Sequence, residues 1–213
     1  MEGKFQKYFT QDEFRNYLAK ILGRDPISVA PGICFVFKTD EAEQDFLDRN
    51  PDRPAFVVLH LMDMHLPYTE PIHYRSLFAG DAPKALGDSY FLRHDITRAA
   101  RSMGEKGKAY VRGRYDNNMR YLDDQLERVF SQLRPDAIVM IVSDHGEEFW
   151  DHGGFEHGHT LYDELLRIPM VLKAPGINPG TFDAPTSLLD VAPTLAGLAG
   201  VDTAGMLGSD LRL

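Results

Sequence analysis

Residues 141–164, IVSDHGEEFWDHGGFEHGHTLYDE, contain an unusual density of side chains that can bind metals or move protons. Four of the chain's eight histidines lie there, together with seven acidic residues. The pair Asp144 and His145 comes one residue after the apolar run AIVMIV, at the end of a predicted strand. A carboxylate beside an imidazole suits zinc, manganese or iron, whereas carboxylates and carbonyls alone would suit calcium or magnesium. The segment therefore predicts a divalent metal site.

A second polar cluster, Asp63 and His65, follows another apolar run, RPAFVVLHL at 53–61. In open α/β sheets, ligands gather where the carboxyl ends of the strands meet diverging loops. If the two strands are neighbours, both polar clusters converge on one spot. After a loop of about a dozen residues, His157 and His159 are far enough along the chain to return to the same rim. Histidines there could hold substrate oxygens or protonate a leaving alkoxide.

Each of these side chains also has a structural interpretation. Asp144 could cap the turn at the strand end, and His65 could be a hydrogen-bonded core histidine. His157 and His159 could belong to a solvated loop, and His152, in DHGG, is interpreted as structural. Singly these signals are weak, whereas their order and spacing are specific.

Strands that alternate with helices predict an α/β fold whose sheet is at least partly parallel. Apolar, β-branched runs predict strands at 32–38, 53–61, 136–144 and 168–175, the second of them buried on both faces. The spacing of apolar side chains predicts helices at 14–22, 40–50, 116–133 and 161–166 and within 186–200. Asp116 is the predicted N-cap of the third helix. Residues 69–115 are interpreted as a long, partly helical excursion over the surface, with a substrate-shaping insertion as the alternative, and the basic part, 98–114, as a solvated face.

The composition is that of a soluble globular protein, with 213 residues, 43% hydrophobic residues and a net charge of −9. This acidic balance gives no reason to expect nucleic acid as a partner. Cys34 is the only cysteine, which excludes an internal disulfide framework. No apolar run approaches the roughly 18 residues of a membrane span, and residues 1–14 lack a signal core. The chain as given is interpreted as soluble; its compartment stays open, and an extracytoplasmic parent protein is compatible with it.

Four motifs occur in order along the chain: PAFVVLHLMDMHLPYTEP, YDNNMRYLDDQLERVFSQL, IVSDHGEEFWDHGGFEHGHTLYDELLRIPMVLKAPG and SLLDVAPTLAGLAG. With these motifs, about residues 53–213 resemble the sulfatase family of the alkaline phosphatase superfamily. The resemblance implies an alkaline-phosphatase-like mixed, mostly parallel sheet flanked by helices. Residues 1–52 are expected to form a separate helix–strand–helix segment with no evident family match.

The resemblance also implies a role for each candidate residue. Asp144 and His145 match the family's paired metal ligands, and the ion is expected to be calcium, zinc or manganese. His65 matches the histidine of a D-x-H-x-P-Y motif that contacts the substrate's sulfate or phosphate. His157 resembles a histidine of the phosphoethanolamine transferases of the same superfamily, and His159 is the alternative for that role. His65 and His157 are the expected catalytic side chains, and all three histidines are expected to bind substrate.

Two features of the family's pattern are missing. Many sulfatases carry a substrate-binding lysine in this region, but Lys173 falls too late in the chain to match it. Its absence favours a phosphoester- or phosphonate-type hydrolase or transferase. The family's nucleophile motif, C/S-x-P-x-R or a threonine, also has no match, since Cys34 is followed by Phe-Val-Phe. The nucleophile is therefore unknown, and the N-terminal part of the fold is expected to be missing.

The sequence accordingly predicts a partial catalytic domain of a metal-dependent, sulfatase-like hydrolase that acts on an anionic sulfate or phosphate ester. Alone it should be inactive, because covalent catalysis needs a nucleophile. One alternative is a phosphoethanolamine- or phosphoryl-transferase-type member of the superfamily. Another is a non-catalytic, sulfatase-like binding module. Uncovered apolar surface is expected to cause self-association or to pair with the missing N-terminal half.

Overall fold

The computed structural model describes residues 33–37, 55–82 and 103–212. Contacts divide the chain into two compact units, residues 1–62 and 63–213. The helices predicted at 14–22 and 40–50 lie outside the described residues, and the domain boundary predicted after residue 52 stays a prediction. Within the described ranges, every helix is too short or too polar to span a lipid bilayer.

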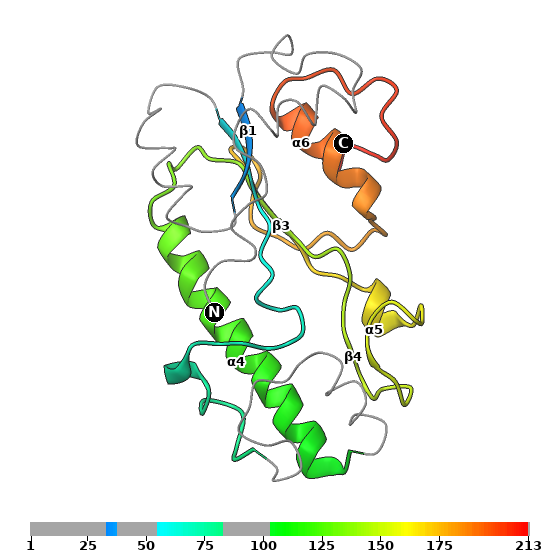
Figure 1. The fold of residues 1–213 in the computed structure, drawn as a ribbon. Coiled ribbons are helices and arrows are strands. Elements are labelled where there is room, and N and C mark those ends of the chain that lie inside the picture. Colours follow the sequence, from blue (N-terminus) through cyan, green and yellow to red (C-terminus); the bar gives the residue numbers. More distant parts are fainter. Residues whose placement is uncertain (1–32, 38–54, 83–102, 213) are drawn as a thin grey trace, which may run out of the picture. The chain divides into compact units, whose positions relative to one another are not determined.

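In the first unit, strand β1 (Ile33–Phe37) pairs in parallel with strand β2 (Ala55–Leu59) along the full length of both strands (Figure 1). Both strands were predicted from their β-branched, apolar sequences. The predicted burial of β2 on both faces is wrong, because Phe56 is 47% and Val58 is 38% exposed. Side chains two positions apart share a face of a strand, so one face of β2 is open.

Helix α4 (Glu105–Phe130) is the longest element of the second unit. It begins well before the predicted start at 116, so Asp116 is an exposed residue within the helix and Gly104 is the N-cap. Glycines lower the helix propensity of a sequence, but close packing explains why a glycine stands at position 113 of this helix. A Cβ atom there would meet the backbone of Ala79 at 2.6 Å, so only glycine lets the loop lie this close.

The second unit contains two small antiparallel sheets. Strand β3 (Val139–Val142) pairs with β6 (Met170–Lys173), and β4 (Glu148–Phe149) forms a hairpin with β5 (Phe155–Glu156). The predicted strands at 136–144 and 168–175 are thus confirmed, although both are shorter. An α/β fold with mixed strand pairing is present, whereas the described residues do not confirm a mostly parallel sheet.

The C-terminal elements match the sequence pattern closely. Helix α5 (Asp163–Leu166) precedes β6, and a 3-10 turn η4 (Leu188–Asp190) leads into helix α6 (Val191–Leu198). Ser187 opens η4 with a capping box, in which its hydroxyl oxygen accepts from a backbone N–H and its own N–H donates to the Asp190 carboxylate. The predicted helix within 186–200 is confirmed.

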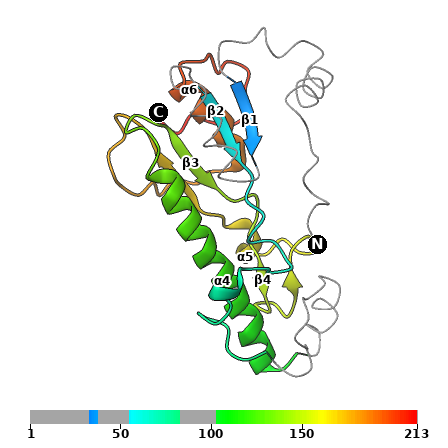
Figure 2. The same cartoon turned by 60° about the vertical axis from the view of Figure 1, so that its left-hand side comes forward.

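A small apolar core joins three segments of the second unit. Leu66 and Tyr68 from the loop after residue 63, Val111 from α4 and Phe155 from β5 are all buried together. Figures 1 and 2 both show α4 running alongside the β4–β5 hairpin, which this core attaches to the helix. The core therefore fixes the loop that carries His65 against the hairpin that precedes His157.

A buried polar network, here called the polar clamp, holds the same loop to α4. It consists of Glu70, Arg114, Asn117 and Asn118. Arg114 forms an ion pair with Glu70 and donates to the Tyr68 carbonyl, while the two asparagine amides donate to the Glu70 carboxylate over 3.3 and 3.2 Å. The interpretation of the basic segment as a solvated face is therefore wrong at Arg114, because this side chain is buried and its charge is paired with the Glu70 carboxylate.

Candidate active site

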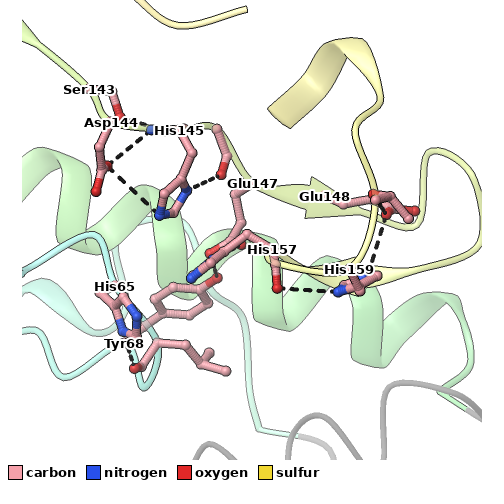
Figure 3. Close-up of polar contacts among 12 residues, drawn as sticks. His65, Tyr68, Ser143, Asp144, His145, Glu147, Glu148, His157 and His159 are labelled. Carbon is pink, nitrogen blue, oxygen red and sulfur yellow. Dashed lines mark hydrogen bonds and ion pairs between the residues drawn. The ribbon is translucent and has the colours of Figure 1, made fainter. Parts of the chain in front are cut away.

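Three of the predicted histidines come together in the second unit (Figure 3). The ring of His157 lies 4.0 Å from that of His145 and 5.2 Å from that of His65, measured between centroids. These three side chains, called the imidazole cluster below, come from the loop after residue 63, the turn after β3 and the segment after β5. Three residues that are distant in sequence thus meet, and their roles stay predictions.

The hydrogen bonds of the imidazole cluster leave the same ring nitrogen available on each histidine. Nδ1 lies 2.6 Å from the Leu66 carbonyl oxygen in His65 and 2.7 Å from the Gly146 carbonyl oxygen in His145. A carbonyl only accepts, so Nδ1 donates and the neutral ring carries its lone pair on Nε2. Among the described residues, no hydrogen bond reaches Nε2 of His65 or His157. The cluster can therefore offer imidazole nitrogens to a ligand.

The turn after β3 is held by its backbone and presents Asp144 beside His145. The Ser143 hydroxyl donates to the His145 carbonyl over 2.6 Å, and the Gly146 amide donates to the Leu165 carbonyl over 2.9 Å. A Cβ atom on Gly146 would collide with the Glu164 carbonyl oxygen, so this close approach requires glycine. The Asp144 side chain is 77% exposed, and its Oδ1 lies 3.8 Å from His145 Nε2.

His157 follows a hairpin with an unusual backbone. Trp150, in the turn directly after β4, and Glu156, the last residue of β5, have φ angles of 65° and 76°, which non-glycine residues rarely adopt. Glu156 is buried and immediately precedes His157, so this backbone conformation helps to set the direction of the imidazole. His157 Nδ1 lies 2.9 Å from Oε1 of Glu147.

Sequence reasoning missed Glu147 and Tyr68. The Glu147 carboxylate faces His157 with one oxygen, and its other oxygen accepts from the Tyr68 hydroxyl over 3.3 Å. Burial, together with the negative charge of Glu147, raises the pKa of Tyr68, so the phenol stays protonated and donates. The only available signal was the position of Glu147 two residues after His145 in the same motif.

His159 lies apart from the imidazole cluster. Its Nε2 is 3.7 Å from Oε2 of the fully buried Glu148, and its Nδ1 is 3.2 Å from the His157 carbonyl oxygen. Figure 3 shows it on the Glu148 side of His157, away from His65. Its predicted role in substrate binding stays a prediction.

His152 belongs to a brace between the hairpin and α5. Its Nδ1 lies 2.7 Å from Oε1 of Glu164, and its ring stacks on Tyr162 at 3.7 Å. Glu148, His152 and Glu164 bring potential ligand atoms within 4.8 Å of one another. Glu148 already accepts hydrogen bonds from the amides of His152 and Gly154. We therefore interpret Glu148, His152 and Glu164 as a structural unit.

Comparison with known proteins decides the family. The sulfatase family model matches residues 4–201, nearly the whole chain. The chain belongs to the sulfatase family. The match includes the N-terminal segment, where the sequence shows no evident family motif.

Related sulfatase-family proteins are considerably longer than this chain. The uncharacterized sulfatase YidJ of Escherichia coli (strain K12) is 29% identical over 175 residues, which cover 74% of this chain and 34% of YidJ. Kdo(2)-lipid A phosphoethanolamine 7''-transferase of the same organism is 30% identical over 157 residues, 71% of this chain and 24% of the transferase. Choline-sulfatase of Rhizobium meliloti (strain 1021) is 35% identical over 92 residues, 41% of this chain and 18% of that enzyme. The chain thus spans about a third of the length of these relatives, or less.

The fold is also that of a sulfatase. The structure of BT1596, a 2-O GAG sulfatase, matches with a TM-score of 0.58 at 16% identity, over 97% of this chain and 56% of BT1596. At this level of identity the likeness concerns the fold. It agrees with the predicted alkaline-phosphatase-like architecture.

Asp144 and His145 fit the divalent metal ion that sulfatase-family membership implies. The fit rests on the donor set: an exposed carboxylate, and an imidazole whose Nδ1 is held by a carbonyl so that Nε2 carries the lone pair. Asp63 is half-buried, burial raises its pKa, and no hydrogen bond or ion pair joins it to the imidazole cluster within the described residues.

Proposed function

We propose that this chain carries part of the active site of a metal-dependent hydrolase of sulfuric or phosphoric esters. The substrate would be an anionic sulfate or phosphate ester. The proposal assigns the metal to Asp144 and His145 and the contacts with the substrate's oxygens to His65 and His157. It names no nucleophile, and the isolated chain is expected to be inactive.

The imidazole cluster carries the proposal. His65 and His157 each have Nδ1 held by an oxygen acceptor, and their ring centroids are 5.2 Å apart, beside His145. Imidazoles required only for packing would be expected to form hydrogen bonds within the protein through both ring nitrogens, or to lie singly in the core. Three that gather beside an exposed carboxylate favour an anionic ligand together with a cation.

The chemistry follows from the protonation states that these contacts allow. A divalent ion held by Asp144 and His145 would polarise a sulfuryl or phosphoryl oxygen and stabilise the charge that develops there. His65 and His157 bind the ester's oxygens through Nε2–H when they are protonated. His157 can then deliver the Nε2 proton to the leaving alkoxide, while its Nδ1–H stays hydrogen-bonded to the Glu147 carboxylate.

A binding experiment tests this assignment without requiring turnover. Inorganic phosphate and sulfate are titrated into the purified chain in the presence of zinc or manganese, with His65→Ala and His157→Ala as variants. We expect measurable anion binding that weakens at least about tenfold in each variant, because each loses a charge-assisted contact. Gln125→Ala, an exchange on the surface of α4, should leave binding unchanged. Equal affinity in all four proteins would contradict the proposal.

Turnover tests the expectation of inactivity. p-Nitrophenyl sulfate and p-nitrophenyl phosphate are incubated with the purified chain, and release of the nitrophenolate is followed. We expect no turnover above that of the buffer. Hydrolysis that is abolished by Asp144→Ala would show that the chain holds a complete active site and would contradict this part of the proposal.

Phosphoryl transfer is the second candidate function. It is supported by the 30% identity over 157 residues with a phosphoethanolamine transferase. It is also supported by the presence of His157 in a region that lacks a match to the sulfatases' substrate-binding lysine. Phosphate binding clearly tighter than sulfate binding in the same titration would favour transfer or hydrolysis of phosphoesters. The reverse order would favour a sulfatase.

A further inference from the structure

Glu147 is the most deeply buried charged group in contact with the imidazole cluster. Its side chain is 7% exposed, yet both carboxylate oxygens have partners. Oε1 lies 2.9 Å from His157 Nδ1, and Oε2 accepts from the Tyr68 hydroxyl over 3.3 Å (Figure 3). Neither contact is local, because His157 is ten residues away and Tyr68 is 79 residues away. The chain therefore places a carboxylate under His157 by its fold.

This contact differs from those that hold the other two rings. His65 and His145 each use the carbonyl of the next residue, a bond that any nearby backbone can supply. His157 alone among the three is held by a carboxylate. A hydrogen bond to an ionised acceptor is roughly twice as strong as a neutral one, and low surrounding polarity strengthens it further.

The carboxylate determines which ring nitrogen of His157 carries the proton. An ionised carboxylate can only accept, so Nδ1 must be the protonated nitrogen of the neutral ring. Nε2 then faces the ligand, and rotation of the ring would break the bond to Glu147. A comparable carboxylate behind a functional histidine fixes both the tautomer and the orientation of the ring.

Tyr68 extends the effect to the loop that carries His65. Its hydroxyl holds the second oxygen of Glu147, while its ring packs in the apolar core with Leu66 and Val111. The Tyr68 carbonyl also accepts from Arg114 of the polar clamp. Movement of Glu147 would thus disturb the loop of His65 as well as the ring of His157.

We propose that Glu147 is the positioning residue of this site: its carboxylate keeps Nδ1 of His157 protonated and turned towards itself, so that Nε2 faces the substrate and, once protonated, donates to its sulfuryl or phosphoryl oxygens. The role in substrate binding rests on the proposed function, whereas the tautomer does not. Tyr68 supports the carboxylate from the other side.

Nitrogen NMR of the histidine rings reads the tautomer directly. The full chain is labelled with ¹⁵N-histidine, and the signals of His157 are assigned with His157→Gln. In the neutral ring of the unchanged protein we expect a protonated Nδ1 and an unprotonated Nε2. In Glu147→Ala both signals should move towards those of a ring that exchanges between tautomers.

Further variants separate positioning from folding. Glu147→Gln keeps the shape of the side chain but removes the charge, so the tautomer preference should weaken even if Glu147→Ala does not fold. Tyr68→Phe removes only the second hydrogen bond and should have a smaller effect on His157. Glu164→Gln breaks a matching histidine–carboxylate contact, at His152, and should leave the signals of His157 unchanged.

Anion binding supplies the second measurement. Affinity for inorganic phosphate or sulfate in the presence of zinc should fall about 10- to 100-fold in Glu147→Gln, the loss that follows removal of a carboxylate behind a metal-ligating histidine. If the unchanged chain binds neither anion, the proposed function fails, and the NMR result still decides the role of Glu147. An unaltered Nδ1–H tautomer in folded Glu147→Gln and Glu147→Ala would overturn the inference.

Discussion

The imidazole cluster and the polar clamp share one loop, which contributes His65 to the first and Glu70 to the second, yet they use polar groups in opposite ways. In the polar clamp, Arg114, Asn117 and Asn118 direct their donors at Glu70, at backbone carbonyls or, in the case of Arg114, at the Tyr110 hydroxyl. In the imidazole cluster, each Nδ1 is held and Nε2 is left to a ligand. Buried polar groups that satisfy one another stabilise the fold, whereas groups held on one side only indicate a binding site.

The comparison leads to opposite expectations for substitutions. A change in the polar clamp should lower the free energy of unfolding, because it leaves a buried charge without its partner. A change in the imidazole cluster should chiefly lower affinity for metal or anion.

Glu70→Ala should have the largest effect on stability. Glu70 is 1% exposed, and its loss leaves Arg114 as a buried cation without its carboxylate. We expect the free energy of unfolding to fall by about 3–5 kcal/mol, measured by urea denaturation followed by circular dichroism. Asp123→Ala removes an exposed partner of Arg120 on the same helix and should change little. Equal effects of the two substitutions would contradict the role of the clamp.

Gly113→Ala tests whether α4 and the loop that contains Ala79 must lie as close together as they do. The added Cβ would meet backbone atoms of Ala79, and a backbone cannot swing aside as a side chain can. We expect a loss of about 1–3 kcal/mol in the same denaturation measurement. Gly80→Ala is the matched control, because a Cβ at Gly80 meets nothing within 4 Å. A neutral Gly113→Ala would show that the loop can move away from α4.

The brace of His152 and Glu164 provides an intermediate case, since it is a histidine–carboxylate pair at an exposed position. The hydrogen bond that His152 Nδ1 donates to Glu164 raises the pKa of His152 above its ordinary value of 6.5. A raised pKa in the folded state means that the pair stabilises fully below pH 6.5 and that this contribution is lost as pH rises through the folded pKa.

The effect at His152 should be the smallest of the three, because solvent screens an exposed pair. Unfolding temperatures measured across this pH range should show a slightly steeper decline in the unchanged chain than in Glu164→Gln. Parallel curves would mean that the pair does not contribute to stability.

The sequence predicted which histidines lie together better than it predicted what holds them, and the roles of these histidines stay predictions. His65, His145 and His157 stand in short motifs at strand ends, and these positions converge because the fold brings loops together. Glu147 and Tyr68 were missed because a contact between residues 79 positions apart leaves no local pattern.

The start of α4 and the polar clamp were also missed, for related physical reasons. Gly107 and Gly113 lower helix propensity, so the pattern was recognised only from residue 116 onward. Glu70 is a residue type that is almost never fully buried unless paired, and its partner Arg114 lies 44 positions away in a segment interpreted as solvated. The β-branched runs, by contrast, predicted four strands, because strand sequences carry their own local signal.

Metal uptake by the purified chain tests the central claim most directly. The metal-free chain is dialysed against zinc or manganese, and the bound metal is determined by elemental analysis for the unchanged chain and for Asp144→Ala, His145→Ala and His152→Ala. We expect affinity to fall at least about tenfold in the first two variants and to stay unchanged in His152→Ala. Loss of metal in His152→Ala, with full uptake in Asp144→Ala and His145→Ala, would place the metal at the brace and contradict the account.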